Sequence, residues 1–446
     1  MPTVSCPNGL KEYDPGADSL HNFVWEESVI PHRYKALPDM FRITRKEGDN
    51  GQALLDIDIL NVKSNFFGYL INTSRLYWRE ETELPFGDDR EASAAYIKAH
   101  PFCIDGEGLQ PYEIAEQKQN LINKIFTFGY MLHRYKDYAR CWAPMAMDNK
   151  IGEEDECNGR SGKSFFFKTL SFLVNTVKLS GRNPKLMDNP HVFEMVSQFT
   201  GILLIDDCDR YLNLGPFYDN ITSDMTVNPK NNKIFTVKFE DAPKLAFTTN
   251  YVPQNFDPST EARSLYMVFS DWYHQKTEDN DYRETRDIRA DFGKTLYDYE
   301  YSEDEWNADI NFWLQCCRFY LSLKDSGLKL QPPMANMVKR HLKASMGANF
   351  EDWAEGYFSP DGEHLDEFLP RDDVFNEYQR FANVNRITMQ AFTKKLKSFC
   401  ILCPWIDCMN PPDLCNTGGR IQRSVMVAPD KRKTKDMIYI ILKTVE

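Results

Sequence analysis

The clearest hydrophobic pattern lies over about residues 141–290, where short apolar runs alternate with helical ones. Buried strands are predicted by "TGILLIDDCD" and "PKLAFTTN", and a half-buried strand by the alternating "KIFTVKFE". An apolar helix is predicted by "KSFFFKTLSFLVNTV". Strands that alternate with helices predict a parallel sheet with helices on both faces, so we expect an α/β fold for this block.

Helical patterns dominate on both sides of that block. Apolar residues recur at spacings of three and four over 111–139, and an amphipathic helix is predicted over 309–323. The last part reads as helices over 370–382 and 387–399, then strands over 424–429 and 437–443, an order that resembles a winged helix. We expect four segments, namely an N-terminal, mainly helical domain (1–140), the α/β core (141–290), a helical connector (291–360) and a winged-helix-like domain (361–446).

Composition places the chain among globular proteins of the cytoplasm. Hydrophobic residues make up 42% and charged residues 27% of its 446 residues, and no apolar run is long enough to span a membrane. The first residues lack the features of a secretory signal, and the eleven cysteines follow no disulfide framework. The net charge of −13 argues against a surface that coats nucleic acid, but it leaves room for a basic channel.

A phosphate-binding loop is indicated by "CNGRSGKS" at 157–164. Lysine and serine follow Gly162 as in the usual pattern, although Cys157 stands where that pattern has its first glycine. In such loops the backbone N–H groups surround phosphates, the lysine reaches the outer phosphates, and the hydroxyl binds Mg²⁺. The alternative is a helix N-terminus with an incidental lysine. The nucleotide-binding residues we expect are Asn158, Gly159, Arg160, Ser161, Gly162, Lys163 and Ser164.

Two acids follow a buried strand about 40 residues downstream. The apolar run 201–205 leads into Asp206 and Asp207. Two carboxylates at a strand end suit a site where one orients Mg²⁺ and the other activates water. We expect Ser164 and Asp206 to bind the metal and Asp207 to be catalytic; the alternative is a strand that emerges into solvent.

Two further polar residues lie beside the next predicted strands. Asn250 ends "PKLAFTTN", where it can sense the terminal phosphate or hold the attacking water. Arg263 precedes "SLYMVF". A lone arginine there is more often a surface residue, but beside the other elements it is a candidate arginine finger that acts on a neighbouring subunit's ATP.

Taken in order, "CNGRSGKS", "ILLIDDCD", "PKNNKIFTVKFEDAPKLAFTTN" and "EARSLYMVF" resemble the motifs of superfamily 3 helicases, in the form of the phage and poxvirus primase–helicases. The resemblance is firm over about 110–290 and weaker outside it. It implies a P-loop NTPase with an AAA+-like core that uses ATP and Mg²⁺ and moves 3′ to 5′ on single-stranded DNA as a homo-hexamer. The matched positions are Lys163 and Ser164 (Walker A), Asp206 and Asp207 (Walker B), Asn250 (sensor 1) and Arg263 (finger).

The same family has a β-hairpin that projects a basic residue toward DNA in the pore. "NPKNNKIFTVK" occupies that place, with Asn231 and Asn232 as the expected tip and Lys230 and Lys233 as the expected DNA-binding residues. The alternative is a solvated turn. About 110 residues precede the helicase-like region, and they contain no convincing primase acids or zinc motif, so priming is not supported and we expect either a separate primase or an untemplated helicase role.

A group of cysteines and a basic run near the C-terminus can each be interpreted in two ways. Cys400, Cys403, Cys408 and Cys415 could bind Zn²⁺, but their spacing is irregular and buried free thiols are the simpler interpretation. The basic run 429–436 could contact a DNA backbone from the tip of a wing, or form a solvated turn.

Three functions remain in view. The first is an ATP-dependent replicative DNA helicase of a phage or mobile element, acting in the bacterial cytoplasm. The second is an AAA+-like initiator or loader that binds DNA with ATP but does not unwind it processively. The third is a P-loop kinase for a small substrate, which leaves the hairpin lysines and Arg263 unexplained.

Overall fold

A computed structural model describes most of the chain, and its residues form two compact units. The first comprises Met1–Gly152 and Cys157–Met334, and the second Glu153–Glu156 and Ala335–Glu446. The four-segment division remains a prediction. The described residues are 3–6, 9–12, 30–47, 53–133, 136–149, 160–209, 211–251, 258–278, 280–323, 326–333, 342, 346–382, 387–416, 419–428 and 431–443.

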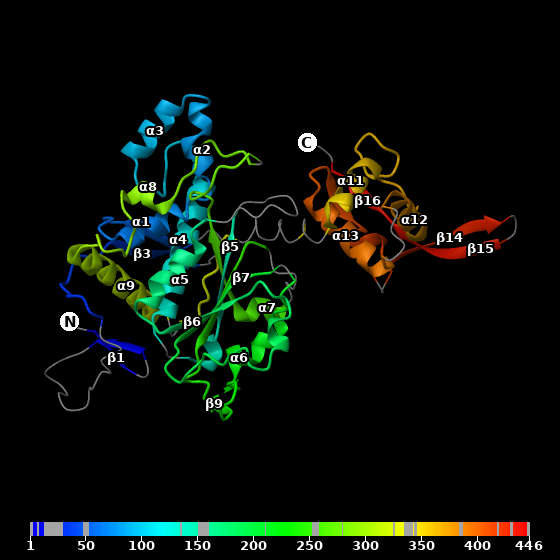
Figure 1. Ribbon diagram of the computed structural model, residues 1–446. Coiled ribbons are helices and arrows are strands. Elements are labelled where there is room, and N and C mark those ends of the chain that lie inside the picture. The colour runs from blue at the N-terminus through cyan, green and yellow to red at the C-terminus, as the bar shows by residue number, and fades with distance from the viewer. Residues whose placement is uncertain are drawn as a thin grey trace. The chain divides into compact units, whose positions relative to one another are not determined.

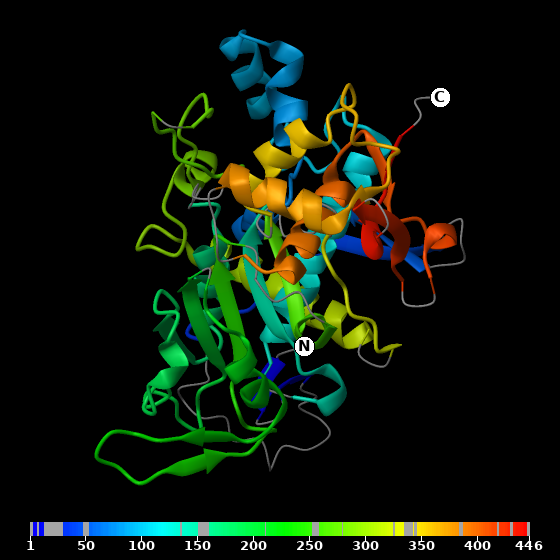
Figure 2. The same ribbon diagram turned by 90° about the vertical axis from the view of Figure 1, so that its right-hand side faces the viewer.

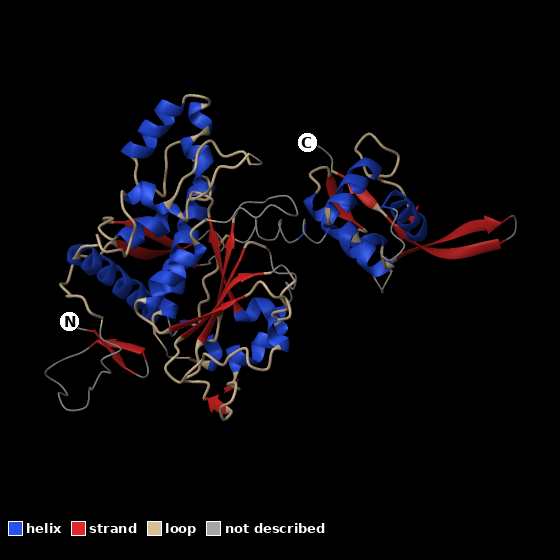
Figure 3. Cartoon of the chain, viewed as in Figure 1, coloured by secondary structure: helices blue, strands red, loops and turns tan. Residues whose placement is uncertain are grey.

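The first unit is built on a five-stranded parallel sheet flanked by helices (Figures 1 and 3). The strand order is β11-β5-β10-β7-β6, and every neighbouring pair is parallel. This sheet confirms the predicted α/β class. Its strands are β5 (Ala143–Asp148), β6 (Thr176–Ser180), β7 (Ile202–Cys208), β10 (Lys244–Thr249) and β11 (Ser264–Phe269).

The other elements of this unit are helices around the sheet and two-stranded hairpins. The helices are α1 (Asn65–Asn72), α2 (Trp78–Thr82), α3 (Arg90–Ala99), α4 (Pro111–Met131), α5 (Lys163–Ser171), α6 (Tyr218–Thr222), α7 (Pro258–Arg263), α8 (Ile288–Phe292) and α9 (Glu303–Leu323). The hairpin strands are β1 (Thr3–Cys6), β2 (Gly9–Glu12), β3 (Phe41–Glu47), β4 (Ala53–Ile59), β8 (Met225–Val227) and β9 (Phe235–Val237). Among the described helices, none combines the length and the apolarity that crossing a bilayer requires.

One predicted helix was wrong over its second half. The expected helix 163–177 ends at Ser171, and residues 176–180 form the edge strand β6. Thr176 pairs with Ile202 of β7, and Thr176, Val177 and Leu179 are half-buried while Lys178 and Ser180 are exposed. The β-branched Thr176 and Val177 suit a half-buried edge strand better than a helix.

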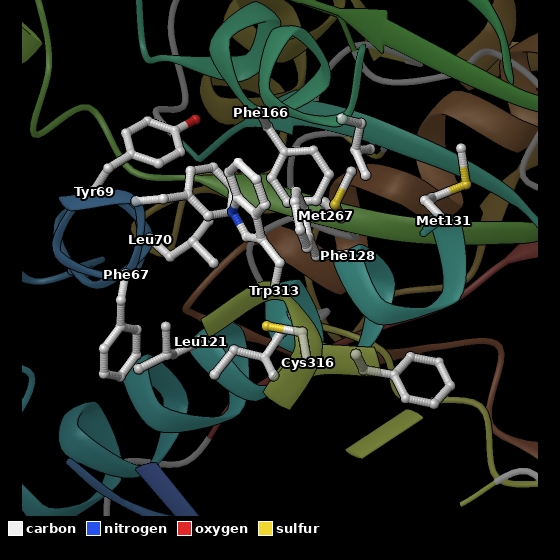
Figure 4. Close-up of a cluster of buried hydrophobic side chains, with 14 of the residues drawn as sticks. Phe67, Tyr69, Leu70, Leu121, Phe128, Met131, Phe166, Met267, Trp313 and Cys316 are labelled. Atoms are coloured by element: carbon white, nitrogen blue, oxygen red, sulfur yellow. The ribbon is translucent and has the colours of Figure 1, made fainter. Parts of the chain in front are cut away.

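The helices and the sheet share one hydrophobic core. Side chains from α1, α4, α5, α9 and β11 meet in it, and Figure 4 shows Phe128, Phe166, Met267 and Trp313 among them. Phe66 of α1 lies 4.7 Å from Phe128 between ring centroids. The N-terminal helices therefore pack directly against the strand–helix layer that carries the phosphate-loop sequence.

A row of amides on α9 fixes an extended segment from the N-terminal part of the chain. Asn307 accepts a hydrogen bond from the backbone N–H of Lys35 at 2.6 Å, and Gln315 accepts one from Met40 at 2.9 Å. Between them, Asn311 accepts one from Leu37 at 2.9 Å. The four-residue spacing of the amides places them on one face of the helix, so α9 holds the segment along its length.

Asp309, also on α9, caps the start of α1. It is buried and accepts hydrogen bonds from the Ser64 hydroxyl at 2.6 Å, the Phe66 N–H at 3.1 Å and the Tyr301 hydroxyl at 2.5 Å. Ser64 in turn accepts from the Phe67 N–H as the N-cap of α1. One carboxylate therefore joins two helices that lie far apart in the sequence.

Replacing Asp309 with alanine should lower the free energy of unfolding by about 3 kcal/mol or more, because three buried donors lose their acceptor. Denaturant unfolding measures this. Burial raises the pKa of Asp309 to about 6 despite the hydrogen bonds it accepts.

Asp309→Asn is the control, since it keeps one oxygen acceptor without the charge. The folded state binds the Asp309 proton more tightly than the unfolded chain, whose pKa is about 3.9, so this group favours folding as the pH falls through about 6. The wild type should therefore gain stability relative to Asp309→Asn between pH 7 and pH 5. An alanine variant as stable as the wild type would contradict the assignment.

Among its described residues, the second unit has three α-helices and two small sheets. Its elements are α11 (Ala348–Tyr357), β12 (Leu369–Pro370), α12 (Arg371–Ala382), α13 (Met389–Leu402), β13 (Ile406–Met409), β14 (Ile421–Ala428), β15 (Lys431–Ile438) and β16 (Ile440–Leu442). The two predicted helices are present. The predicted strand 437–443 is divided, because Ile438 ends β15 while β16 pairs with β13. Of the basic run 429–436, residues 431–436 lie in β15, where we expected a turn.

Candidate functional site

The predicted phosphate loop ends at the N-terminus of α5. Arg160 and Gly162 both have positive φ, 77° and 97°, and Gly162 is the N-cap residue. Among the described residues no side chain caps the helix, so its first backbone N–H groups suit an anion. A Cβ at Gly162 would lie 2.9 Å from the Tyr69 ring, whose hydroxyl donates to the Gly162 carbonyl at 2.8 Å. Cys157, Asn158 and Gly159 lie outside the described residues.

Lys163 is buried at the first position of α5 and forms an ion pair with Asp148. Asp148 ends β5, the strand that precedes the loop. The same carboxylate oxygen accepts from the Ser161 hydroxyl, which lies 3.2 Å from the Lys163 ammonium. The predicted phosphate-binding lysine thus has an acidic partner that the sequence analysis did not include.

Ser164 and Asp206 come together as predicted. The Ser164 hydroxyl donates to Asp206 Oδ1 at 3.4 Å, although α5 and β7 are separate elements. Asp206 also accepts from the Thr248 hydroxyl at 2.6 Å and pairs with the Lys178 ammonium at 2.6 Å. Burial raises the pKa of Asp206, but the hydrogen bonds from Lys178 and Thr248 outweigh it, so the pKa lies below its usual value. Asp206 is therefore ionised at neutral pH, as a metal ligand must be.

Asp207 lies beside Asp206 in an unusual backbone conformation. Its φ is 56°, and the pairing of β10 with β7 shifts register there. Successive side chains of a regular strand point to opposite faces, and a bulge can redirect one of them. The Asp207 carboxylate pairs with Arg182 at 2.6 Å and accepts from the Asn250 amide at 3.4 Å. Asn250 and Asp207 are thus neighbours, as expected for a water-positioning pair.

Arg263 lies at the opposite edge of the sheet. It precedes Ser264, which pairs with Ala143 at the start of β5, whereas Asp148 at the end of β5 pairs with Phe269. Five residue steps at about 3.3 Å each separate the two ends of the strands by roughly 16 Å. The Arg263 guanidinium lies over the Tyr218 ring, 5.2 Å from its centroid. The structure therefore does not bring Arg263 together with Lys163 and Asp207 of the same chain.

The predicted hairpin lies between β8 and β9, and Figure 2 shows it extending away from the parallel sheet. Val227 pairs with Phe235, and Asn231 has the positive φ (65°) that a tight tip requires. Lys230, Lys233 and the tip asparagines are all exposed. In the described part of the chain, neither lysine has an acidic partner, in contrast to Lys238, which pairs with Asp224 at 3.1 Å.

The residues at the carboxyl edge of the sheet fit a nucleoside triphosphate with Mg²⁺. A buried ammonium and uncapped helix N–H groups suit phosphate oxygens. The Ser164 hydroxyl and the Asp206 carboxylate supply the oxygen ligands that Mg²⁺ prefers. These observations concern chemical fit, and binding itself stays a prediction.

Sequence reasoning missed Asp148, Lys178, Arg182 and Thr248, which pair with Lys163, Asp206 or Asp207. Asp148 ends the apolar run "APMAM", the same signal that identified Asp206. Thr248 also carried a signal, because it lies two residues before Asn250 on a predicted strand. Lys178 and Arg182 could be placed only once β6 was known to be a strand.

The cysteine cluster gains no support as a metal site. Cys400, Cys403, Cys408 and Cys415 are free thiols. Within the residues that the structure describes, no three His, Cys, Asp or Glu side chains converge as metal ligands. Burial raises the pKa of Cys400 to about 12, as expected for a buried free thiol.

Comparisons with known proteins give distant structural similarity only. No family model and no curated protein matches the sequence. Among solved structures, the A-form apo structure of the NrS-1 C-terminal region is similar over 73% of this chain and 71% of that chain, with 10% sequence identity and a TM-score of 0.32. Because similarity at this level does not establish a family, the assignment of function depends on the geometry of the site.

Proposed function

We propose that this chain is an ATP-dependent DNA helicase of replication, encoded by a phage or mobile element and acting as a homo-hexameric ring on single-stranded DNA. The observation that carries the proposal is the meeting of the loop serine with the strand-end acid, Ser164 with Asp206 at 3.4 Å, beside the buried Lys163. A helix N-terminus with an incidental lysine would not place a hydroxyl and a carboxylate together there.

The proposed chemistry is attack of water on the terminal phosphate of ATP. Bound Mg²⁺ would neutralise phosphate charge, held by Ser164 and Asp206. Lys163 and the α5 N–H groups bind the phosphates. Asp207 accepts the proton of the water. Asn250, whose amide lies 3.4 Å from the Asp207 carboxylate, orients that water.

Two further observations support a ring that acts on DNA rather than a small-molecule kinase. The exposed lysines at the β8–β9 tip suit phosphates of a single strand, which they would follow without reading sequence. Arg263, at the far edge of the sheet from its own Lys163, suits a finger that completes a neighbour's site. The winged-helix-like domain and a separate primase remain parts of this proposal.

The competing proposal is an initiator or loader that binds DNA with ATP but does not unwind it. ATP hydrolysis with and without single-stranded DNA, followed by strand displacement on a forked duplex, separates the two. The helicase hydrolyses ATP faster with DNA and displaces the strand. Slow turnover without displacement selects the loader, and absence of ATP binding rejects both.

Replacing both Lys230 and Lys233 with alanine should weaken single-strand binding and flatten its salt dependence. Each lost phosphate contact reduces the slope of log K against log salt by about 0.7, so the expected change is about 1.4. Binding titrations over a range of salt concentrations measure it. Lys238→Ala is the matched control, because that lysine lies at the base of the hairpin and pairs with Asp224. A double variant with wild-type affinity and slope argues for a solvated turn.

A further inference from the structure

Asp148 occupies a position that nucleotide binding alone does not explain. It ends β5, which has five buried residues before it, and is itself only 4% exposed. Its Oδ1 accepts from both Lys163 and Ser161. Its Oδ2 is buried and has no hydrogen-bond partner among the described residues.

A buried carboxylate in this place acts on the lysine in two ways. An ion pair between buried groups fixes the direction of the ammonium, since leaving either charge unpaired costs several kcal/mol. The ammonium has three donors, and Asp148 and Ser161 engage it from one side. A phosphate that reaches Lys163 must therefore share the ammonium with Asp148.

The same charge opposes the ligand. Phosphate oxygens bound to Lys163 lie close to the Asp148 carboxylate, and like charges a few ångströms apart repel strongly where water is excluded. The repulsion grows with the charge carried by the phosphates nearest the lysine. It is therefore largest for a triphosphate and smallest for a monophosphate.

We propose that Asp148 is a positioning residue that orients the Lys163 ammonium through their ion pair and lowers the affinity of the site for nucleotide phosphates. This inference rests on the proposed function, because it presupposes that the loop binds ATP. Asp148 acts through Lys163 and need not touch the nucleotide. Its role is distinct from those of Asp206 and Asp207, which face the metal and the attacking water.

The test is the affinity of the full chain for ATP, ADP and AMP with Mg²⁺, before and after Asp148→Asn. Asparagine keeps an acceptor for Ser161 and removes the charge. We expect roughly tenfold tighter ATP binding, a smaller gain for ADP and no gain for AMP. In steady-state hydrolysis the KM for ATP should fall while kcat does not rise, because the enzyme–ATP complex and the transition state gain the same binding energy.

Two controls isolate the charge of Asp148. Asp148→Glu keeps the charge and should not tighten ATP binding. Asp188→Asn removes an equal charge from an exposed position and should leave all three affinities unchanged. If Asp148→Asn does not fold, Asp148→Ser offers a smaller neutral acceptor for the same measurement.

The outcomes separate this inference from the proposed function. A wild-type chain that binds no ATP removes both. A wild type that binds ATP, with a folded Asp148→Asn variant that binds it equally or more weakly, overturns the role of Asp148 alone. Failure of both neutral variants to fold would assign Asp148 to the fold and overturn the inference as well.

Discussion

Lys163→Ala is expected to abolish ATP hydrolysis, with a loss of at least about a thousandfold in kcat/KM. The ammonium is the only buried cation described at the N-terminus of α5, the end of the helix that would bind the outer phosphates under the proposed function. Alanine removes this charge while the helix N–H groups remain. Phosphate release from ATP measures the effect, and normal hydrolysis by the variant would refute the loop assignment.

The ion pair with Asp148 complicates this variant, because alanine leaves a buried carboxylate without its cation. The expected cost is roughly 3 kcal/mol of folding free energy. The double variant Lys163→Ala with Asp148→Asn should therefore regain thermal stability without regaining activity. Lys168→Ala is the matched control, since this exposed lysine of the same helix should be dispensable for both properties.

Arg263→Ala is expected to leave ATP binding intact and to reduce turnover by about a thousandfold, the range found for arginine fingers. The strand register explains how ATP binding can stay intact while turnover falls, because Arg263 precedes β11 at the end of the strands remote from Lys163 of the same chain. Arg263→Lys should recover little, since it keeps the charge but loses the planar fork. A fully active Arg263→Ala protein would remove the finger assignment.

Mixed assemblies test whether the arginine acts on a neighbour. Subunits with Lys163→Ala cannot hydrolyse ATP but still offer Arg263, while Arg263→Ala subunits keep an intact loop. Mixing the two inactive proteins should restore part of the activity if the sites form between subunits. Arg289→Ala, at an exposed position on α8, is the control for loss of a surface arginine. An inactive mixture whose subunits have exchanged would show that Arg263 does not act on a neighbour's site.

The sequence predicted the centre of the sheet well because its strands are buried on both faces. Runs such as "GILLI" have few alternatives to a buried strand, and the polar residues that end them mark the carboxyl edge. The meeting of Ser164 with Asp206 and of Asp207 with Asn250 follows from that geometry. Whether these neighbours bind nucleotide stays a prediction.

The remainder could not be predicted because it depends on contacts between distant residues. β6 is an edge strand of five residues, too short for its alternation to outweigh the apolar helix before it. Because β6 was not predicted, its residue Lys178 and the following Arg182 were not predicted as partners of Asp206 and Asp207. The basic residues 431–436 pair with β14, and a charged run carries no local signal for such pairing. The hairpin tip was predicted because Asn231 is a residue that tolerates a positive φ.

The amide row on α9 and the cap from Asp309 also bear on how the chain folds during its synthesis. The residues that secure segment 35–40 and the start of α1 lie about 245 to 275 positions further along the chain. At roughly 5–20 residues per second, a ribosome needs some tens of seconds to deliver them. Until then the Ser64 hydroxyl and the Phe66 N–H at the start of α1 lack their acceptor, so α1 reaches its final position only after the strands of the parallel sheet and α9 have been synthesised.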